Sequence, residues 1–402
     1  MSNVRKSILV FIANPNGWRN PNTFGGGEGI TIKVLLQIDE FDWYVITTNQ
    51  LLNSIKQDKE LFNCIKRNNV FVFPIPLLFF KTNILGDIIQ GISYLFKSIR
   101  IAYSLKSKID LVYSSTNNFI DIFPASIVKN IFNKKLIIKY HISLYSHRDF
   151  ISIFKNYIKE KNGFFDSVIR ALLARITLFM FSSATKIICV SEHLRSQLLK
   201  CGIKKSKLVT NHNGVDFIYL KQFIHKYKKK YDFCYIGRIE KNKGISDLIN
   251  LVDNLIKRSS LSPNLIIIGD GTFLDKAKLL VKQKKLEKNI TFTGYIGEER
   301  YKILQQSKIF VNPTYALEGF GLTILESLYF DIPVISYTNF VFNDIFRRSR
   351  NAILIAPNLE VLIKNVKVAL LRKTNHGKDN FLKEYTLDKC RINEKKIINS
   401  LL

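Results

Sequence analysis

The sequence lacks the cysteine spacings that disulfide frameworks and zinc sites require. Among its 402 residues there are five cysteines, and no two of them form a C-x-x-C pair; they are Cys64, Cys189, Cys201, Cys234 and Cys390. A disulfide-stapled secreted scaffold and a structural zinc module are therefore excluded as interpretations. We expect reduced thiols, as in a cytoplasmic protein.

Long apolar runs are also absent. The stretch VFVFPIPLLFF at 70–80 is too short to span a bilayer and contains two prolines. The N-terminal SILVFIANPNG has a short apolar run followed by Asn, Pro and Gly, which predicts a first strand and a turn in place of a signal peptide. No internal repeat or low-complexity tract is evident, so the sequence reads as an ordinary globular protein.

Acidic residues are the scarce class of charge. The chain has 32 Asp and Glu against 61 Lys and Arg, a formal net charge of +29. Such an excess attracts anionic partners, and nucleic acid, an anionic membrane surface and a phosphorylated substrate are the candidates. A simple surface preference for lysine would give the same count. No recognition helix or aromatic-basic strand surface is evident, so we expect no nucleic-acid partner.

Two segments, 81–108 and 150–181, mix basic side chains with Ile, Leu, Phe and Tyr. As helices they would suit peripheral contact with an anionic membrane, such as the inner face of the cell membrane; a helix packed on a core, with a solvated basic side, is the alternative. The basic residues are Lys81, Lys97, Arg100, Lys106 and Lys108 in the first segment, and Lys155, Lys159, Lys161, Arg170 and Arg175 in the second.

Short apolar runs, in contrast, are abundant and recur at the spacing of β-α-β units. Several lack polar alternation, which is typical of strands buried on both faces of a parallel sheet. The pattern predicts an α/β protein with two doubly wound, Rossmann-like domains. The expected strands are 7–13, 43–48, 70–73, 109–114, 135–140 and 185–190 in the first half, and 231–236, 264–268, 290–293, 308–312, 333–336 and 352–355 in the second.

The length of the chain also favours two domains. The stretch 212–233 opens with the turn Asn213-Gly214 and continues as a lysine-rich connector. We therefore expect a first domain over 1–215 and a second over 228–380. The last segment, LDKCRINEKKIINSLL, has a helical pattern, and a C-terminal helix within 385–402 could pack back on the first domain.

The stretch KIFVNPTYALEGFGLTILESLYF combines a predicted strand, two glycines and two acids. Gly319-Phe320-Gly321 bends the chain before an amphipathic helix, which leaves backbone N–H groups over 320–323 for a phosphate. Glu318 precedes the helix and Glu326 lies within it. Carboxylates accept hydrogen bonds from the hydroxyl pairs of sugars, although a cap at Glu318 and a solvated Glu326 would be the alternative.

Two further motifs suggest contacts to anions. In YIGRIEKNKGISDLI, Arg238 and Lys243 follow a strand end, where an open α/β sheet binds its ligand; solvated loop charges are the alternative. In FGGGEG, Gly26 and Gly27 precede a helix, so that backbone amides could approach an anion; a tight structural turn is the alternative.

Together these motifs resemble those of the retaining glycosyltransferases of family GT4, within the group 1 glycosyl transferases. Glu318, Gly319, Phe320, Gly321 and Glu326 resemble the family's E-x7-E signature, and GRIEKNKG is similar to its G-R-x4-K-G motif. HNGVD resembles the interdomain N-G-V-D turn, FTGYI the F-x-G strand end, and GGGEG the N-terminal glycine loop. The likeness covers nearly the whole chain, with the motifs in the family's order.

The resemblance implies a GT-B fold, in which two Rossmann-like domains face each other across a cleft. It implies transfer of a sugar from a nucleotide-diphosphate sugar, with retention of anomeric configuration, to a glycan or lipid-linked acceptor in surface polysaccharide or glycoconjugate synthesis. Such enzymes generally need no bound metal, and the nucleotide-sugar is a co-substrate, so no cofactor is expected.

The resemblance also assigns roles by position. Arg238 and Lys243 would hold the donor diphosphate, Glu326 the ribose hydroxyls and Glu318 the donor sugar. The backbone of Gly319, Phe320, Gly321, Leu322 and Thr323 would complete the phosphate and sugar contacts, and Gly26 and Gly27 would close on the donor from the other domain.

A histidine completes the predicted site. His141 follows the apolar run 135–140, and family members often have a histidine there, near the anomeric carbon; His147 and a simply packed histidine are the alternatives. A sugar-nucleotide epimerase or phosphorylase of the same architecture and a non-catalytic binder are the other functional interpretations. The complete set of Arg238, Lys243, Glu318 and Glu326 favours an active transferase.

Overall fold

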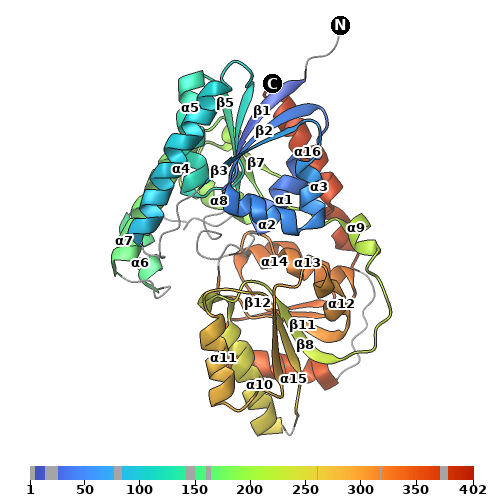
Figure 1. The fold of residues 1–402 in the computed structure, drawn as a ribbon. Coiled ribbons are helices and arrows are strands. Elements are labelled where there is room, and N and C mark those ends of the chain that lie inside the picture. The colour runs from blue at the N-terminus through green and yellow to red at the C-terminus, as the bar shows by residue number, and fades with distance from the viewer. Residues whose placement is uncertain are drawn as a thin grey trace. The chain divides into compact units, whose positions relative to one another are not determined.

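The computed structural model describes residues 5–13, 26–76, 84–141, 150–159, 164–259, 261–316, 318–371 and 379–402, apart from the side chains at 84–88, 150, 156–159, 166 and 170. The chain divides into unit 1, Met1–Asn213 with Leu387–Leu402, and unit 2, Gly214–Thr386 (Figure 1). The sequence predicts the first domain at 1–215 and the second from 228 onward. In the structure, residues 214–227 belong to unit 2. The C-terminal segment belongs to unit 1.

Unit 1 is built on a seven-stranded parallel sheet with the order β3-β2-β1-β4-β5-β6-β7. Because helices cover both faces of the sheet, side chains on both sides of its central strands are buried, and these strands are unbroken apolar runs. Val112, for example, is fully buried. The strands are β1 (Lys6–Phe11), β2 (Phe41–Thr48), β3 (Val70–Ile75), β4 (Leu111–Ser114), β5 (Lys135–Tyr140), β6 (Lys186–Cys189) and β7 (Leu208–Thr210).

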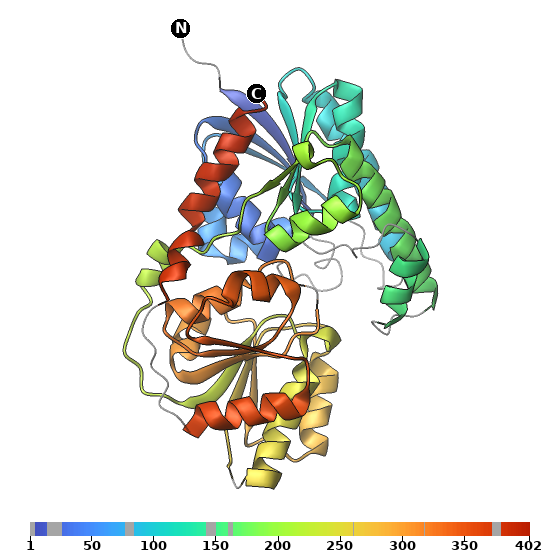
Figure 2. The ribbon, with the colours of Figure 1, turned by 180° about the vertical axis from the view of Figure 1, so that it is seen from behind.

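Helices flank both faces of this sheet. The helices are α1 (Gly26–Leu35), α2 (Asn49–Gln57), α3 (Lys59–Ile65), α4 (Ile84–Ser104), α5 (Phe119–Phe132), α6 (Phe150–Lys159), α7 (Phe164–Ser183), α8 (Glu192–Lys200) and α16 (Leu387–Asn399). Figures 1 and 2 show α4, α5 and α7 together on one side, and α1, α3 and the red α16 on the other. α16 packs directly against α1.

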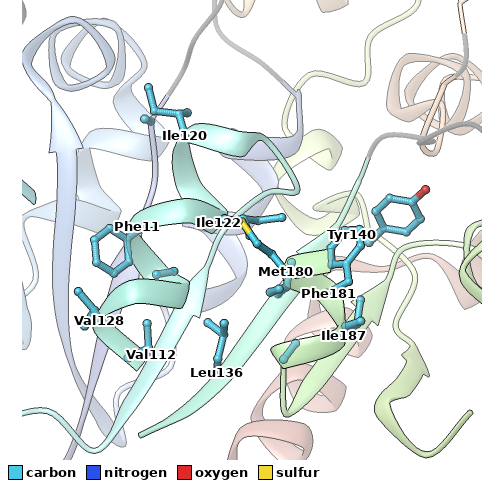
Figure 3. Close-up of a cluster of buried hydrophobic side chains, with 14 of the residues drawn as sticks. Phe11, Val112, Ile120, Ile122, Val128, Leu136, Tyr140, Met180, Phe181 and Ile187 are labelled. Atoms are coloured by element: carbon cyan, nitrogen blue, oxygen red, sulfur yellow. The ribbon is translucent and has the colours of Figure 1, made fainter. Parts of the chain in front are cut away.

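A cluster of apolar side chains joins the sheet of unit 1 to α5 and α7. Figure 3 shows side chains of both helices pointing toward those of the strands. Because all of them are buried, the cluster fixes these two helices on the sheet. Its labelled members are Phe11, Val112, Leu136, Tyr140 and Ile187 from strands, Ile120, Ile122 and Val128 from α5, and Met180 and Phe181 from α7.

A buried polar network fastens α16 to the sheet. The Lys139 ammonium on β5 lies 3.2 Å from the Glu394 carboxylate on α16, and both side chains are fully buried. Tyr113 on β4 donates its hydroxyl hydrogen to Glu394, and Asn211 donates to Glu394 Oε2 at 2.5 Å and to the Cys390 carbonyl at 3.0 Å. The last helix of the chain is thereby tied to the strands of unit 1.

Unit 2 contains a six-stranded parallel sheet with the order β10-β9-β8-β11-β12-β13. Its strands are β8 (Tyr231–Ile236), β9 (Leu265–Ile268), β10 (Ile290–Gly294), β11 (Ser307–Asn312), β12 (Val334–Tyr337) and β13 (Ala352–Ile355). Its helices are α9 (Phe217–Lys221), α10 (Ile245–Ser259), α11 (Leu274–Gln283), α12 (Glu299–Gln305), α13 (Leu322–Tyr329), α14 (Phe340–Phe346) and α15 (Leu359–Leu371).

The core of unit 2 has two halves. One half contains Leu325 of α13 and Phe346 of α14, and the other contains Val252 of α10 and Val366 of α15. Both halves include strand residues, as expected for a doubly wound sheet. The predicted fold class is thus confirmed: each unit is a parallel, Rossmann-like α/β domain.

The remaining sequence expectations concern thiols and membranes. All five cysteines lie in the described part of the chain, where they are buried and form no disulfide. Within the described ranges, none of the helices is both long and apolar enough to cross a bilayer.

Candidate functional site

Both sheets contain a point at which the strand order reverses. In unit 2 the chain runs from β8 outward to β9 and β10, and then returns to place β11 on the other side of β8. In unit 1 the corresponding neighbours are β1 and β4. Open α/β sheets bind ligands beyond the carboxyl ends of their strands at such a point. The predicted motifs around Arg238 and Glu318 follow β8 and β11, the two strands that flank it in unit 2.

The loop after β11 needs glycine where it enters α13. Gly321 has φ 92°, and a Cβ atom there would lie 2.9 Å from Cε1 of Phe342. It is the N-cap of α13 and, as a glycine, it provides no side-chain cap. The start of α13 therefore keeps backbone N–H groups and a partial positive charge for an anion. The Phe320 side chain is buried, with its ring edge against Tyr385, so this residue can offer a ligand only its backbone.

Close backbone contact brings Lys243 to Glu318. Gly244 has φ 73°, and a Cβ atom on it would lie 1.9 Å from the Pro313 carbonyl oxygen. Tyr315 N also donates to the carbonyl of the neighbouring Asn242 at 2.9 Å. Because the two loops touch, the Lys243 ammonium forms an ion pair with the Glu318 carboxylate. Two residues predicted to contact the donor are thus paired with each other.

Glu326, on α13, is held by two neighbours from α12. The Tyr301 hydroxyl donates to Glu326 Oε1 at 3.3 Å, and Arg300 Nη2 lies 3.6 Å from the same oxygen. Arg300 Nη2 also donates to the Tyr301 hydroxyl at 2.5 Å, and its guanidinium lies 4.2 Å from the centre of the Tyr301 ring. The second acid of the signature is therefore part of an ordered set of side chains.

Among the described residues, Arg238 is a cation without a carboxylate partner. It follows β8, is partly buried, and its side chain makes no hydrogen bond or ion pair with the described part of the chain. Its backbone is fixed, because the Tyr235 hydroxyl donates to the Arg238 carbonyl at 3.0 Å. Burial raises the pKa of Tyr235 well above its usual value, so this hydroxyl stays protonated as a donor. The guanidinium is left available to an anion.

In unit 1, His141 lies beside the start of α1. Its Nε2 is 3.1 Å from Thr31 Oγ1, its Nδ1 is 3.4 Å from Asn213 Nδ2, and its backbone N–H donates to Asn117 Oδ1 at 2.9 Å. Gly27 lies on the imidazole: a Cβ atom there would be 3.2 Å from the ring's Cγ. The structure therefore brings Gly27 and His141 together, whereas Gly26 is exposed at the first position of the helix.

The surroundings of His141 keep it neutral. Burial, and then the nearby charge of Lys139, lower its pKa well below the usual value. The Thr31 hydroxyl donates to the Gly27 carbonyl at 2.9 Å, so its oxygen is left to accept from His141 Nε2–H. We assign the proton to Nε2 on this ground. Nδ1 then carries a lone pair beside Asn213.

Comparisons with known proteins identify the family of the chain. The family model described as glycosyl transferases group 1 matches residues 217–384, and the model described as glycosyltransferase family 4 matches residues 58–217. The chain belongs to the GT4 glycosyltransferases. An uncharacterized glycosyltransferase of Methanocaldococcus jannaschii is 24% identical over 92% of this chain and 93% of its own length.

Two further comparisons extend the picture of this GT4 glycosyltransferase. The alpha-monoglucosyldiacylglycerol synthase of Acholeplasma laidlawii is 30% identical, over 33% of this chain and 32% of its own. The crystal structure of HepE from Anabaena in complex with UDP-glucose has a TM-score of 0.71, with 14% identity, and covers 98% of this chain and 100% of the other. The structural likeness identifies the fold as GT-B.

The fold places four further residues beside those that the sequence motifs singled out, namely Arg300, Tyr301, Thr31 and Asn213. The signal for Arg300 and Tyr301 is their place just after the strand end FTG, at the same edge as Arg238. Thr31 gave no signal and Asn213 was noted only as part of a turn, because only the fold brings these two residues to His141. His147 lies outside the described residues.

Proposed function

We propose that this GT4 glycosyltransferase transfers a sugar from a nucleotide-diphosphate sugar to a glycan or lipid-linked acceptor, with retention of anomeric configuration. The observation that carries the proposal is Arg238, which has no ion-pair partner among the described residues and lies beside the switch point of unit 2, where Lys243 and the glycine-capped start of α13 also lie. Positive groups at this place suit a diphosphate. Surface polysaccharide or glycoconjugate synthesis is the proposed setting.

In the proposed reaction the bond between the anomeric carbon and the diphosphate oxygen breaks, and the diphosphate keeps the electron pair. The acceptor hydroxyl oxygen forms the new bond on the same face of the sugar, and its proton passes to the departing phosphate. Arg238, Lys243 and the first N–H groups of α13 would stabilise the negative charge that develops on the leaving group. This charge set is the reason to propose that neither a metal nor a cofactor is required.

The other site residues would orient the donor. Glu326 would accept hydrogen bonds from the ribose hydroxyls, and Glu318 would contact the sugar once the diphosphate competes for Lys243. The backbone of Gly319, Phe320, Gly321, Leu322 and Thr323, and that of Gly26 and Gly27, would line the donor. His141 would orient a sugar hydroxyl through Nδ1, the ring nitrogen that is less closely held.

The test is the product. The protein is incubated with UDP-, GDP- and ADP-sugars and a lipid or glycan extract, in the presence and absence of EDTA, and new linkages are analysed by NMR. We expect an acceptor-dependent product with the anomeric configuration of the donor and unchanged yield in EDTA. An inverted linkage would contradict retention, and an acceptor-independent change of the donor sugar would indicate an epimerase.

We propose further that the protein binds its acceptor at the surface of an anionic membrane, and that α4, α6 and α7 contact the membrane. On α4, Ile92, Phe96 and Tyr103 are 50–68% exposed and follow at intervals of four and seven residues, along one stripe. Arg100 continues this stripe and is exposed as well. An apolar stripe that contains a cation suits the boundary between lipid headgroups and acyl chains.

The same arrangement recurs on α7. Phe165, Leu172 and Phe179 follow at intervals of seven residues and are 54–80% exposed, with Arg175 in the same stripe. The sequence of α4 contains one acidic residue, Asp87, that of α7 contains one, Asp166, and that of α6 contains none. A surface that is both apolar and mainly basic is complementary to anionic lipid. The Acholeplasma laidlawii relative is, by its name, a synthase of a diacylglycerol glycolipid.

Vesicle flotation tests this contact. We expect binding to vesicles with anionic phospholipid that weakens at high salt, and a smaller bound fraction for the Phe165→Ser/Phe179→Ser variant. Phe340→Ser removes a phenylalanine of unit 2 that is 71% exposed and serves as the matched control, with unchanged binding. Equal binding of all three proteins would contradict the assignment of the surface.

A further inference from the structure

We infer that Arg300 and Tyr301 are positioning residues that orient Glu326 toward the ribose of the nucleotide. The inference rests on the proposed function for the identity of the ligand. It adds two residues of α12 that neither the sequence motifs nor the proposed reaction employ. Both lie just after β10, whose carboxyl end is at the same edge of the sheet as the loops that carry Arg238 and Glu318.

The direction of each hydrogen bond follows from the donors available. A guanidinium can only donate, so the contact of 2.5 Å between Arg300 Nη2 and the Tyr301 oxygen uses an Arg300 hydrogen. The tyrosine hydroxyl has a single hydrogen, which is then free to point at Glu326 Oε1, 3.3 Å away. We call this chain from Arg300 through Tyr301 to Glu326 the relay.

The relay fixes one oxygen of the Glu326 carboxylate and leaves the other open. The ion pair of Arg300 and the hydroxyl of Tyr301 both involve Oε1, and within the described chain Oε2 accepts no hydrogen bond. The Glu326 side chain is nevertheless 14% exposed, so a ligand can reach it. A carboxylate held at one oxygen presents a fixed acceptor at the other, which is what a ribose hydroxyl pair requires.

The packing of the two residues supports this role. Tyr301 is buried, and its ring contacts those of Phe223 at 4.9 Å and Phe330 at 5.7 Å, so the hydroxyl position is set by the core. The guanidinium of Arg300 is held over the Tyr301 ring, and it donates a hydrogen bond of 2.9 Å to the Gly297 carbonyl. The relay therefore has little freedom to move, and its contacts restrict the conformation of the Glu326 side chain.

A matched pair of single-atom variants separates this role from general stability. Tyr301→Phe removes the hydroxyl of the relay and keeps the buried ring. Tyr329→Phe also removes one tyrosine hydroxyl hydrogen bond from unit 2, the donation to the Phe217 carbonyl at 2.9 Å, and does so on α13, the helix that carries Glu326. Any difference between the two variants in ligand selectivity is therefore due to the relay.

The experiment is calorimetric titration of the whole chain with UDP, GDP and ADP and with their 2′-deoxy counterparts. We expect the wild type to prefer the ribose form of the nucleotide it binds, and Tyr301→Phe to reduce that preference at least threefold. Tyr329→Phe should keep the wild-type preference. Arg300→Met should act in the direction of Tyr301→Phe, with a higher KM for the donor and little change in kcat.

Each other result counts against the inference. An unchanged preference in Tyr301→Phe, or an equal loss in Tyr329→Phe, would overturn it. Binding of ribose and deoxyribose forms with equal affinity by the wild type would overturn it while leaving the diphosphate site intact. Failure of the folded wild type to bind any of the nucleotides would overturn the proposed function, and the inference with it.

Discussion

In the Glu394→Gln variant, unit 1 should unfold at a much lower denaturant concentration than in the wild type. The change keeps the size of the side chain and removes the negative charge beside Lys139, whose ammonium is fully buried. At the observed separation of 3.2 Å, the Coulomb attraction of the pair is about 5 kcal/mol with an effective dielectric constant of about 20. Removal of one partner of a buried pair costs about 3–5 kcal/mol, and we expect a loss in this range.

The tryptophans of the chain give an assay that is specific for unit 1. The sequence has two, Trp18 and Trp43, and both precede Gly214, at which unit 2 begins; Trp18 lies outside the described residues. Trp43 is fully buried in β2. Tryptophan fluorescence during urea unfolding therefore follows unit 1, whereas circular dichroism follows both units. The shift caused by Glu394→Gln should be seen in the fluorescence transition.

Two further variants decide whether the unpaired charge is the cause. The double variant Lys139→Met/Glu394→Gln has no buried charge, and Gln can still bond to Tyr113 and Asn211, so it should be more stable than Glu394→Gln alone. Glu360→Gln removes the carboxylate of an exposed pair with Arg258 in unit 2 and should cost at most about 1 kcal/mol. A loss below about 1 kcal/mol for Glu394→Gln, or strictly additive effects in the double variant, would refute the reasoning.

Two other predictions concern the two sheet edges. Glu318→Gln frees Lys243 from its ion pair, so a nucleoside diphosphate should bind about threefold to fivefold tighter in calorimetry, while turnover falls; weaker binding than in the wild type would contradict this. Burial lowers the pKa of His141. Below about pH 6.5 the imidazole is therefore protonated in the unfolded chain but stays neutral in the folded protein. The stability of unit 1 should therefore fall by about 1.4 kcal/mol per pH unit on acidification below pH 6.5, until the lowered pKa is reached. His141→Gln should lose this part of the pH dependence in fluorescence-monitored unfolding, and an identical pH profile in the variant would contradict it.

Much of the fold could be predicted because buried parallel strands have a direct sequence signature. Runs such as 135–140 and 264–268 are apolar without alternation, and both are strands of the two sheets. The three-residue strand β7, at Leu208–Thr210, was missed because it is shorter than any periodic signal and depends on pairing with β6. The sheet orders likewise follow from long-range pairing, which no local pattern encodes.

The candidate site could be predicted where glycine and charge occur together along the chain. Gly244 and Gly321 have positive φ and close backbone or ring contacts, which explains why the motifs around Lys243 and Glu318 require glycine. The pairing of Lys243 with Glu318, and of Tyr301 with Glu326, joins residues far apart in sequence, and it follows only from the folded sheet. The contact between Asn213 and His141 likewise follows only from the tertiary structure of unit 1.

The central claim is that the edge of the unit 2 sheet binds the diphosphate of a nucleotide-sugar through Arg238. Calorimetric titration with UDP-, GDP- and ADP-sugars tests it most directly, using wild type, Arg238→Met and, as a matched control, Arg258→Met, whose arginine is exposed on α10 of the same unit. We predict binding of at least one donor class, at least tenfold weaker binding by Arg238→Met, and unchanged binding by Arg258→Met. No binding of any donor by the folded wild type, or wild-type affinity in Arg238→Met, would contradict the claim.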